Sequence, residues 1–134
     1  MAKQKNANLA GIELTEAEWT IMKVVWEYEP CAAGTVQETL EGTKDWAYST
    51  VKTTMDRMVT KGLLEITRIR NLQLFSSKIT ESDAQKGEFR KMLGRAFNGA
   101  LTPMMQFLVE NEDLSGEDLK QLRTFVDNAQ KKTK

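Results

Sequence analysis

Apolar residues recur at helical spacing between Asp45 and Gly62, and this pattern predicts a helix with two different faces. Val51, Met55, Met58 and Val59 recur at helical spacing, so they can face a core together. The opposite side carries polar and charged residues, namely Ser49, Lys52, Thr53 and Asp56, with Arg57 beside them. One face is therefore expected to pack, while the other face is free to contact a partner.

The segment after Gly62 alternates apolar and polar residues, which predicts two strands joined by a turn over residues 69–71. Arg68 and Arg70 fall at the tip of this predicted hairpin. A polar, partly cationic helix face followed by a basic hairpin favours binding in a DNA groove. A solvated helix face next to an ordinary hairpin is the alternative interpretation.

Two further helices are predicted upstream. Thr15 and Glu18 have the spacing of a capping box and open the first helix, which Pro30 ends. A second short helix is expected from Gly34 to Leu40. Three helices followed by a hairpin describe a winged helix, in which the second and third helices form the helix-turn-helix pair.

The pattern after the hairpin is helical, with predicted helix starts at Thr80, at Thr102-Pro103 and at Ser115. Three short helices carry more apolar surface than they can bury alone, so a homodimer is expected, with folding back onto the winged helix as the alternative. The residues expected to form the dimer interface are Phe89, Met92, Leu93, Phe97, Met104, Met105, Leu108, Leu119, Leu122 and Phe125. The predicted organisation is a disordered tail over residues 1–12, a winged-helix domain over 13–79 and a helical dimerisation domain over 80–134. The expected fold class is mainly α with a small β-hairpin.

Charge is distributed unevenly along the 134 residues, although 19 basic residues balance 19 acidic ones. The stretch from Gly11 to Gly42 holds one Lys and seven Glu, whereas Thr43 to Lys78 holds seven basic and three acidic residues. Phosphate contacts depend on local cations, so a neutral total is compatible with DNA binding. It predicts modest non-specific affinity that falls steeply with salt.

Residue types that the chain lacks narrow its chemistry. There is no histidine and a single cysteine, Cys31, which excludes the usual zinc sites and any nucleophile paired with histidine. We therefore expect no enzyme activity, no metal and no cofactor. No segment has the pattern of a signal peptide or a membrane span, which predicts a cytoplasmic protein. Cys31 is expected to be a small buried apolar residue, with a redox role as the alternative.

Four sequence blocks resemble a known family of bacterial transcriptional repressors. They are L-T-E-A-E-W-T-I-M-K-V-V-W from Leu14, D-W-A-Y-S-T-V-K-T-T-M-D-R-M-V-T-K-G-L-L from Asp45, F-S-S-K-I-T from Phe75 and V-E-N-E-D-L-S-G-E-D-L-K-Q-L-R from Val109. In this order and spacing they resemble the BlaI/MecI/CopY, or penicillinase repressor, family. The resemblance implies a homodimer that binds an inverted-repeat operator in double-stranded DNA and blocks transcription until it is induced.

The same resemblance implies roles for individual residues. Ser49, Thr50, Lys52 and Thr53 would meet bases and nearby phosphates, Arg57 would hold the DNA backbone or a carboxylate such as Asp56 or Asp45, and Arg68 and Arg70 would contact flanking phosphates. Ala47 stands where many members have a serine that caps this helix.

The inducing signal is left open between a β-lactam, copper and another compound. The chain lacks the paired C-terminal cysteines of copper-responsive members. Phe107 and Leu108 match the position where β-lactam-responsive members are cleaved after a membrane sensor protease is activated, but the asparagine of that bond is missing. A winged helix that binds another protein instead of DNA is the alternative function.

Overall fold

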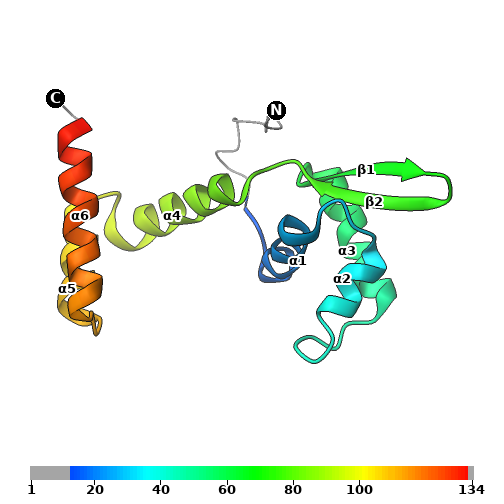
Figure 1. The fold of residues 1–134 in the computed structure, drawn as a ribbon, viewed down its shortest axis with the longest axis horizontal. Coiled ribbons are helices and arrows are strands. Elements are labelled where there is room, and N and C mark those ends of the chain that lie inside the picture. The colour runs from blue at the N-terminus through cyan, green and yellow to red at the C-terminus, as the bar shows by residue number, and fades with distance from the viewer. Residues whose placement is uncertain (1–12, 133–134) are drawn as a thin grey trace. The chain divides into compact units, whose positions relative to one another are not determined.

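The computed structural model describes residues 13–132, and the predicted disordered tail over residues 1–12 lies outside them. Six helices and one antiparallel hairpin follow one another along this part of the chain (Figure 1). Their bounds are α1 Glu16–Tyr28, α2 Ala33–Thr39, α3 Tyr48–Lys61, β1 Leu64–Ile69, β2 Leu72–Ser77, α4 Glu81–Phe97, α5 Leu101–Asn111 and α6 Gly116–Lys132. The predicted fold class, mainly helical with a small hairpin, is confirmed.

The start of α1 is fixed by the predicted capping box. The Thr15 hydroxyl accepts a hydrogen bond from the backbone N–H of Glu18, and the Glu18 carboxylate accepts one from the N–H of Thr15. These two bonds satisfy backbone donors that have no partner inside the helix. The helix ends at Tyr28, two residues before Pro30, as the sequence indicated.

The helix-turn-helix pair differs slightly from its predicted bounds. Helix α2 begins at Ala33 and ends at Thr39, so Leu40 is its C-cap and Gly42 lies in the following turn with a φ of +88°. Helix α3 ends as predicted, at Gly62, whose φ of +91° is in the left-handed region that glycine adopts at little cost.

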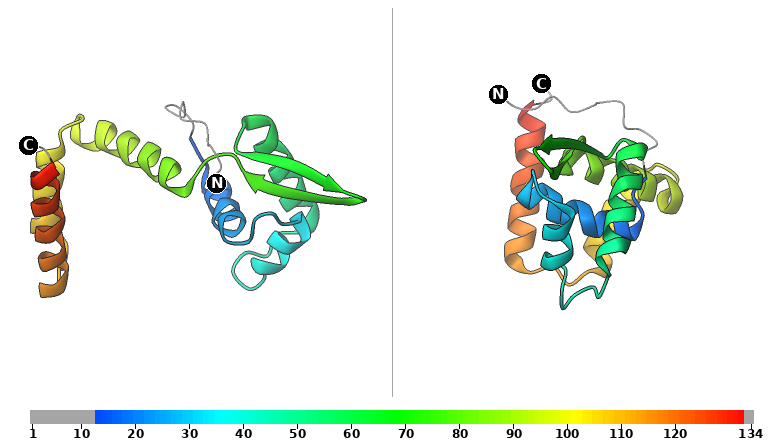
Figure 2. Two further views of the ribbon diagram at one scale, coloured as in Figure 1. Left: turned by 45° about the horizontal axis from the view of Figure 1, so that its top comes forward. Right: turned by 90° about the vertical axis from the view of Figure 1, so that its right-hand side faces the viewer.

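The hairpin turn is tighter than predicted. Ile69 belongs to β1 and pairs with Leu72, so the turn consists of Arg70 and Asn71 alone, and the expectation of a turn over residues 69–71 was wrong. A tight turn at this point is possible because Arg70 adopts a φ of +58°. The hairpin extends away from α1, α2 and α3 in two views (Figures 1 and 2).

Contacts across the chain fasten the base of this hairpin. Cys31 and Phe75 exchange two backbone hydrogen bonds of 3.0 and 2.7 Å. These bonds form an isolated antiparallel β-bridge between β2 and the segment that precedes α2. The Glu29 carboxylate accepts hydrogen bonds from the backbone N–H and the hydroxyl of Ser77. The indole of Trp26 donates to the carbonyl oxygen of Ile79 at 3.0 Å. The hairpin base is therefore joined to both ends of the α1–α2 connection.

One hydrophobic core joins α1, α2, α3 and the hairpin. Its largest fully buried side chains include Phe75 from β2, Ile21 and Met22 from α1, and Met55 and Met58 from α3. The three tryptophans, Trp19, Trp26 and Trp46, are partly buried and pack against this core. The third helix is thus held by one side only.

The chain divides into two compact units, one up to Arg90 and the other from Lys91. The second unit contains the end of α4, α5 and α6. Helix α6 starts after Ser115, as predicted, and Ser115 and Asp118 exchange two hydrogen bonds at this start. Helix α5, however, begins at Leu101 and not at Thr102-Pro103, with Ala100 as an N-cap that makes no side-chain hydrogen bond.

Side chains in the second unit remain accessible. Of the residues described between Lys91 and Lys132, none is buried, and α5 and α6 both lack a buried residue. Large apolar side chains are well exposed there, including Phe107 on α5 and Phe125 on α6, at 54% and 62%. The described residues of this unit therefore form no hydrophobic core of their own within a single chain.

Candidate nucleic-acid interface

Helix α3 has one buried face and one exposed face. Val51, Met55 and Met58 are fully buried, as their spacing predicted. We call the opposite side the outer face of α3, which consists of Ser49, Thr50, Lys52, Thr53, Asp56 and Arg57. Five of these side chains are exposed, and that of Lys52 is partly exposed. The buried methionines and valine fix the rotation of the helix, and this rotation directs the hydroxyl, ammonium, carboxylate and guanidinium groups outward.

Two opposite charges on the outer face of α3 are paired. The ammonium nitrogen of Lys52 lies 3.0 and 2.9 Å from the two carboxylate oxygens of Asp56, one helical turn away. Asp56 is therefore the partner of Lys52. The expectation that Arg57 could hold the Asp56 carboxylate was wrong. Within residues 13–132, Arg57 forms no ion pair and is exposed. The spacing of four residues between Lys52 and Asp56 would have been enough to predict this pair.

Lys61, at the end of α3, serves the fold instead. Its ammonium group donates to the Glu18 carboxylate at 2.8 Å and to the backbone oxygen of Glu13 at 2.7 Å. Glu18 is buried. Lys61 was counted among the cations of the basic stretch, but its charge is balanced by a carboxylate 43 residues earlier, and no local sequence signal could have shown this.

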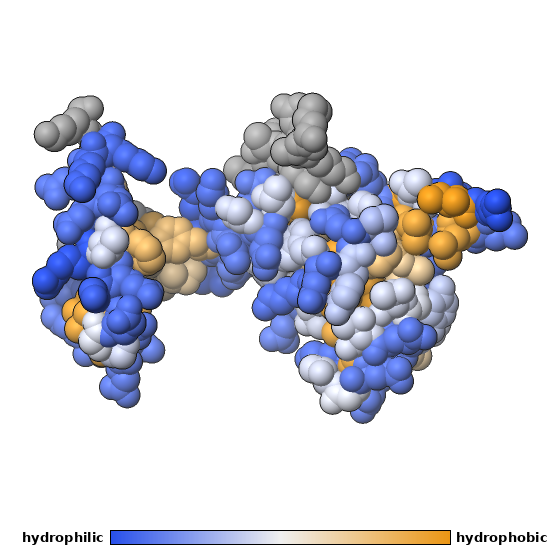
Figure 3. Space-filling view, in the orientation of Figure 1, coloured by the Kyte–Doolittle hydropathy of each residue, from blue (hydrophilic) through white to orange (hydrophobic). Residues whose placement is uncertain are grey.

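We call the β1–β2 hairpin with its two-residue turn the wing. Arg68, on β1, and Arg70, at the turn, are both exposed. An apolar patch lies on the hairpin beside its hydrophilic tip (Figure 3), and the exposed apolar residues next to the turn are Ile69 and Leu72. The sequence predicted the two arginines but not that apolar side chains beside them would be exposed.

The side chains of the outer face and the wing suit a polyanionic partner. Hydroxyl groups of Ser and Thr can donate to or accept from base edges and phosphates. Arginine binds phosphate through a planar, always charged group, and lysine can reach either a phosphate or the acceptor edge of guanine. This arrangement can hold a nucleic-acid backbone and present polar groups to base edges.

Cys31 lies in the core of the first unit and is 5% exposed. Burial raises the pKa of its thiol, and the charge of Glu29 raises it further. A thiol kept protonated in this way is a poor nucleophile, which supports a packing role.

Within residues 13–132, no group of three His, Cys, Asp or Glu side chains could hold a metal ion. No helix in the same range is long and apolar enough to cross a bilayer.

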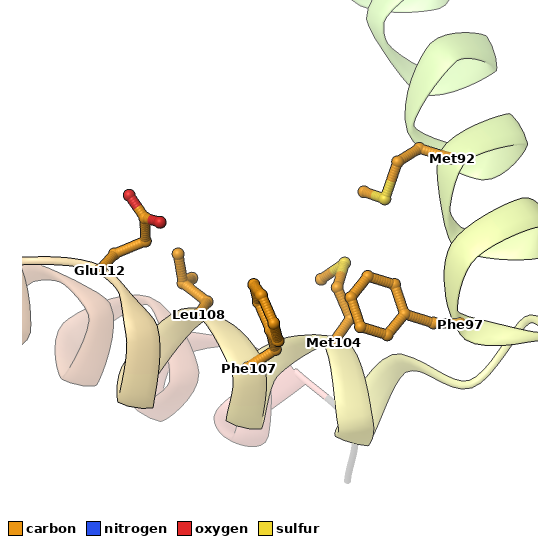
Figure 4. Close-up of a pocket in the computed structure, with 6 residues that line it drawn as sticks. All are labelled: Met92, Phe97, Met104, Phe107, Leu108 and Glu112. Atoms are coloured by element: carbon orange, nitrogen blue, oxygen red, sulfur yellow. The ribbon is translucent and has the colours of Figure 1, made fainter.

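The second unit contains an open apolar hollow. Met92 and Phe97 from α4 and Met104, Phe107 and Leu108 from α5 point into the same space, with Glu112 at one end (Figure 4). The rings of Phe97 and Phe107 meet edge to face, with centroids 5.9 Å apart.

The position that matches the family's cleavage site, Phe107 and Leu108, lies inside α5 and not in a loop. A protease acting between them would need this helix to open first.

A helix-turn-helix followed by a two-stranded wing defines the first unit as a winged helix. The family model described as penicillinase repressor matches residues 14–128. The chain belongs to the penicillinase repressor family.

Known relatives match most of the chain. The penicillinase repressor of Bacillus licheniformis is 28% identical over 122 residues, which are 91% of this chain and 95% of that protein. The methicillin resistance regulatory protein MecI of Staphylococcus aureus strain N315 is 25% identical over 114 residues, which are 85% of this chain and 93% of that protein. Among solved structures, the Bacillus licheniformis BlaI monomeric form in complex with the blaP half-operator covers 60% of this chain and 93% of its own, with 26% identity and a TM-score of 0.48.

Proposed function

We propose that this protein is a transcriptional repressor that binds double-stranded DNA through α3 and the wing. The observation that carries the proposal is the two-faced α3, whose buried side is fully apolar and whose outer face is polar and accessible. A helix fixed in a core along one side, with short polar side chains on the other, matches the major groove in width and chemistry. Membership of the repressor family supports the same function.

Each part of the interface has a proposed role. Ser49, Thr50, Lys52 and Thr53 contact base edges and nearby phosphates, and Arg57 holds the DNA backbone. Arg68 and Arg70 on the wing contact phosphates that flank the groove. Lys61 has no such role, because Glu18 and the chain before α1 already hold its ammonium group.

We propose further that the protein acts as a homodimer joined through residues 80–134. Helices α5 and α6 have no buried residue in one chain, and their exposed apolar side chains need a partner surface. A two-fold dimer presents two copies of α3, which explains recognition of an inverted repeat. Repression then follows because the dimer occupies the operator until an inducing signal removes it.

Operator binding can be tested with an electrophoretic mobility shift on the promoter upstream of the protein's own gene. A DNA-binding repressor should give a sequence-specific shift that is lost steeply between low and moderate salt. The rival function, a winged helix that binds another protein, predicts no sequence-specific shift at any salt concentration. The balanced total charge of the chain is the observation that favours this rival.

A further inference from the structure

We infer that Asp56 is a specificity-determining residue, which weakens binding to DNA of the wrong sequence and accepts a hydrogen bond from a cytosine amino group at the correct site. This inference rests on the proposed function. It begins with the position of Asp56 on the outer face of α3, where it is exposed between Lys52 and Arg57. A surface meant for a polyanion here carries a negative charge.

The stability of α3 does not explain this carboxylate. Aspartate has a low propensity for helix interiors, and acidic side chains are favoured near a helix N-terminus, whereas Asp56 is the ninth of 14 residues. The ion pair with Lys52 has the acid on the C-terminal side, which is the less favourable order for a pair four residues apart. The pair is also exposed to solvent and screened by salt.

On DNA of arbitrary sequence, Asp56 opposes binding in two ways. Both of its oxygens hold the ammonium group of Lys52, so a phosphate must displace a carboxylate to reach that cation. Its charge also repels phosphates that approach this side of the helix. Since non-specific affinity comes from cations that replace counterions on phosphates, the pair removes close to one such contact.

At the correct sequence both partners find new hydrogen bonds. Lysine donates to the O6 and N7 acceptors of guanine, and a carboxylate accepts from the N4 amino group of cytosine. Residues four apart on a helix are separated by about 6 Å along its axis, close to two base-pair steps. Lys52 and Asp56 can therefore meet bases of two G·C pairs that lie two steps apart, and the energy lost in separating the two side chains is recovered only there.

The experiment first enriches a duplex from a random pool with the full-length wild-type protein and then compares it with a scrambled duplex of equal composition. Asp56→Asn should bind the scrambled duplex several-fold more tightly, and the ratio of the two affinities should fall about tenfold. Its salt dependence on scrambled DNA should steepen by about one ion. Glu27→Gln makes the same charge change on an exposed part of α1 and should leave the affinity ratio unchanged.

A second variant identifies the base. Each G·C pair of the enriched duplex is replaced in turn, and the affinity of each protein for the altered duplex is measured. At one pair, replacement should weaken binding of the wild type but leave the affinity of Asp56→Ala unchanged. Equal changes on both duplexes, or sensitivity retained at every pair, would overturn the role of Asp56 while leaving the repressor assignment intact. If the wild type enriches no sequence at all, both proposals fail together.

Discussion

The ammonium group of Lys61 lies 2.8 Å from the carboxylate of Glu18 and joins the end of α3 to the start of α1. The same carboxylate oxygen accepts the capping hydrogen bond from the backbone N–H of Thr15. A buried carboxylate thus serves both a helix start and a contact between helices. This contact adds stability to the packing of α3 against α1, while the apolar face of α3 sets the orientation of the helix.

We expect Lys61→Met to lower the free energy of unfolding by about 1 to 3 kcal/mol, because Glu18 then keeps a buried charge without its cation. Chemical denaturation measures the change. Lys23→Met removes an exposed lysine of α1 and should have little effect. DNA affinity of the folded Lys61→Met protein should stay near wild type, and a large loss would show that Lys61 contacts DNA after all.

Ala47→Ser should stabilise the protein by about 0.5 to 1 kcal/mol. Ala47 is the N-cap of α3 and makes no side-chain hydrogen bond, so a serine hydroxyl can accept from the free N–H of Ser49 or Thr50. Thermal unfolding followed by circular dichroism provides the measurement. Ala47→Val lacks an acceptor and should bring no gain, so equal stabilisation by both variants would refute the capping argument.

Lys52→Ala should weaken operator binding by about 1 to 3 kcal/mol, the range for a lost base contact. The side chain is partly exposed on the outer face of α3 and carries one of the cations of that face. Fluorescence anisotropy with labelled operator gives the affinity, and Lys23→Ala controls for the loss of a positive charge elsewhere. An unchanged affinity would remove Lys52 from the interface.

Arg70→Gly should affect stability and DNA binding in opposite directions. Arg70 has a φ of +58°, a conformation that costs a residue with a side chain about 1 kcal/mol or more and glycine very little. We therefore expect equal or slightly higher stability, weaker operator binding and a salt dependence reduced by about one ion. Asn71→Gly changes the same turn without removing a charge. If both variants bind alike, Arg70 makes no phosphate contact.

Phe125→Lys should convert the proposed dimer into a monomer. Phe125 is 62% exposed on α6 in the single chain, and a charge placed in an apolar interface is costly to bury. Sedimentation equilibrium at micromolar concentration reports the mass of each species. Asn128→Lys adds the same charge to the same helix and should remain dimeric. A monomeric wild type would contradict the dimer directly.

Features set by neighbouring residues could be predicted from the sequence. The capping box of Thr15 and Glu18, the bonds between Ser115 and Asp118 and the end of α3 at Gly62 all depend on residues within one helical turn. The buried and exposed faces of α3 followed from the spacing of its apolar residues, since a helix with one apolar stripe has few ways to pack.

Contacts between distant residues could not be predicted in this way. Lys61 meets Glu18 across 43 positions, Ser77 meets Glu29 across 48 and Trp26 meets Ile79 across 53. Each exists only once the core has formed.

The start of α5 at Leu101 was missed for a local reason. Pro103 is the third residue of the helix, where the backbone N–H has no helical partner, so proline is tolerated inside the first turn.

The β-bridge between Cys31 and Phe75 fixes the segment before α2 relative to β2, the second strand of the wing. Helices α2 and α3 and the hairpin also share one core, so a ligand that touches both α3 and the wing meets groups whose spacing was set during folding. Less conformational entropy is lost on association when the two contact regions are preorganised. Each of these small contacts can then contribute more of its interaction energy to affinity.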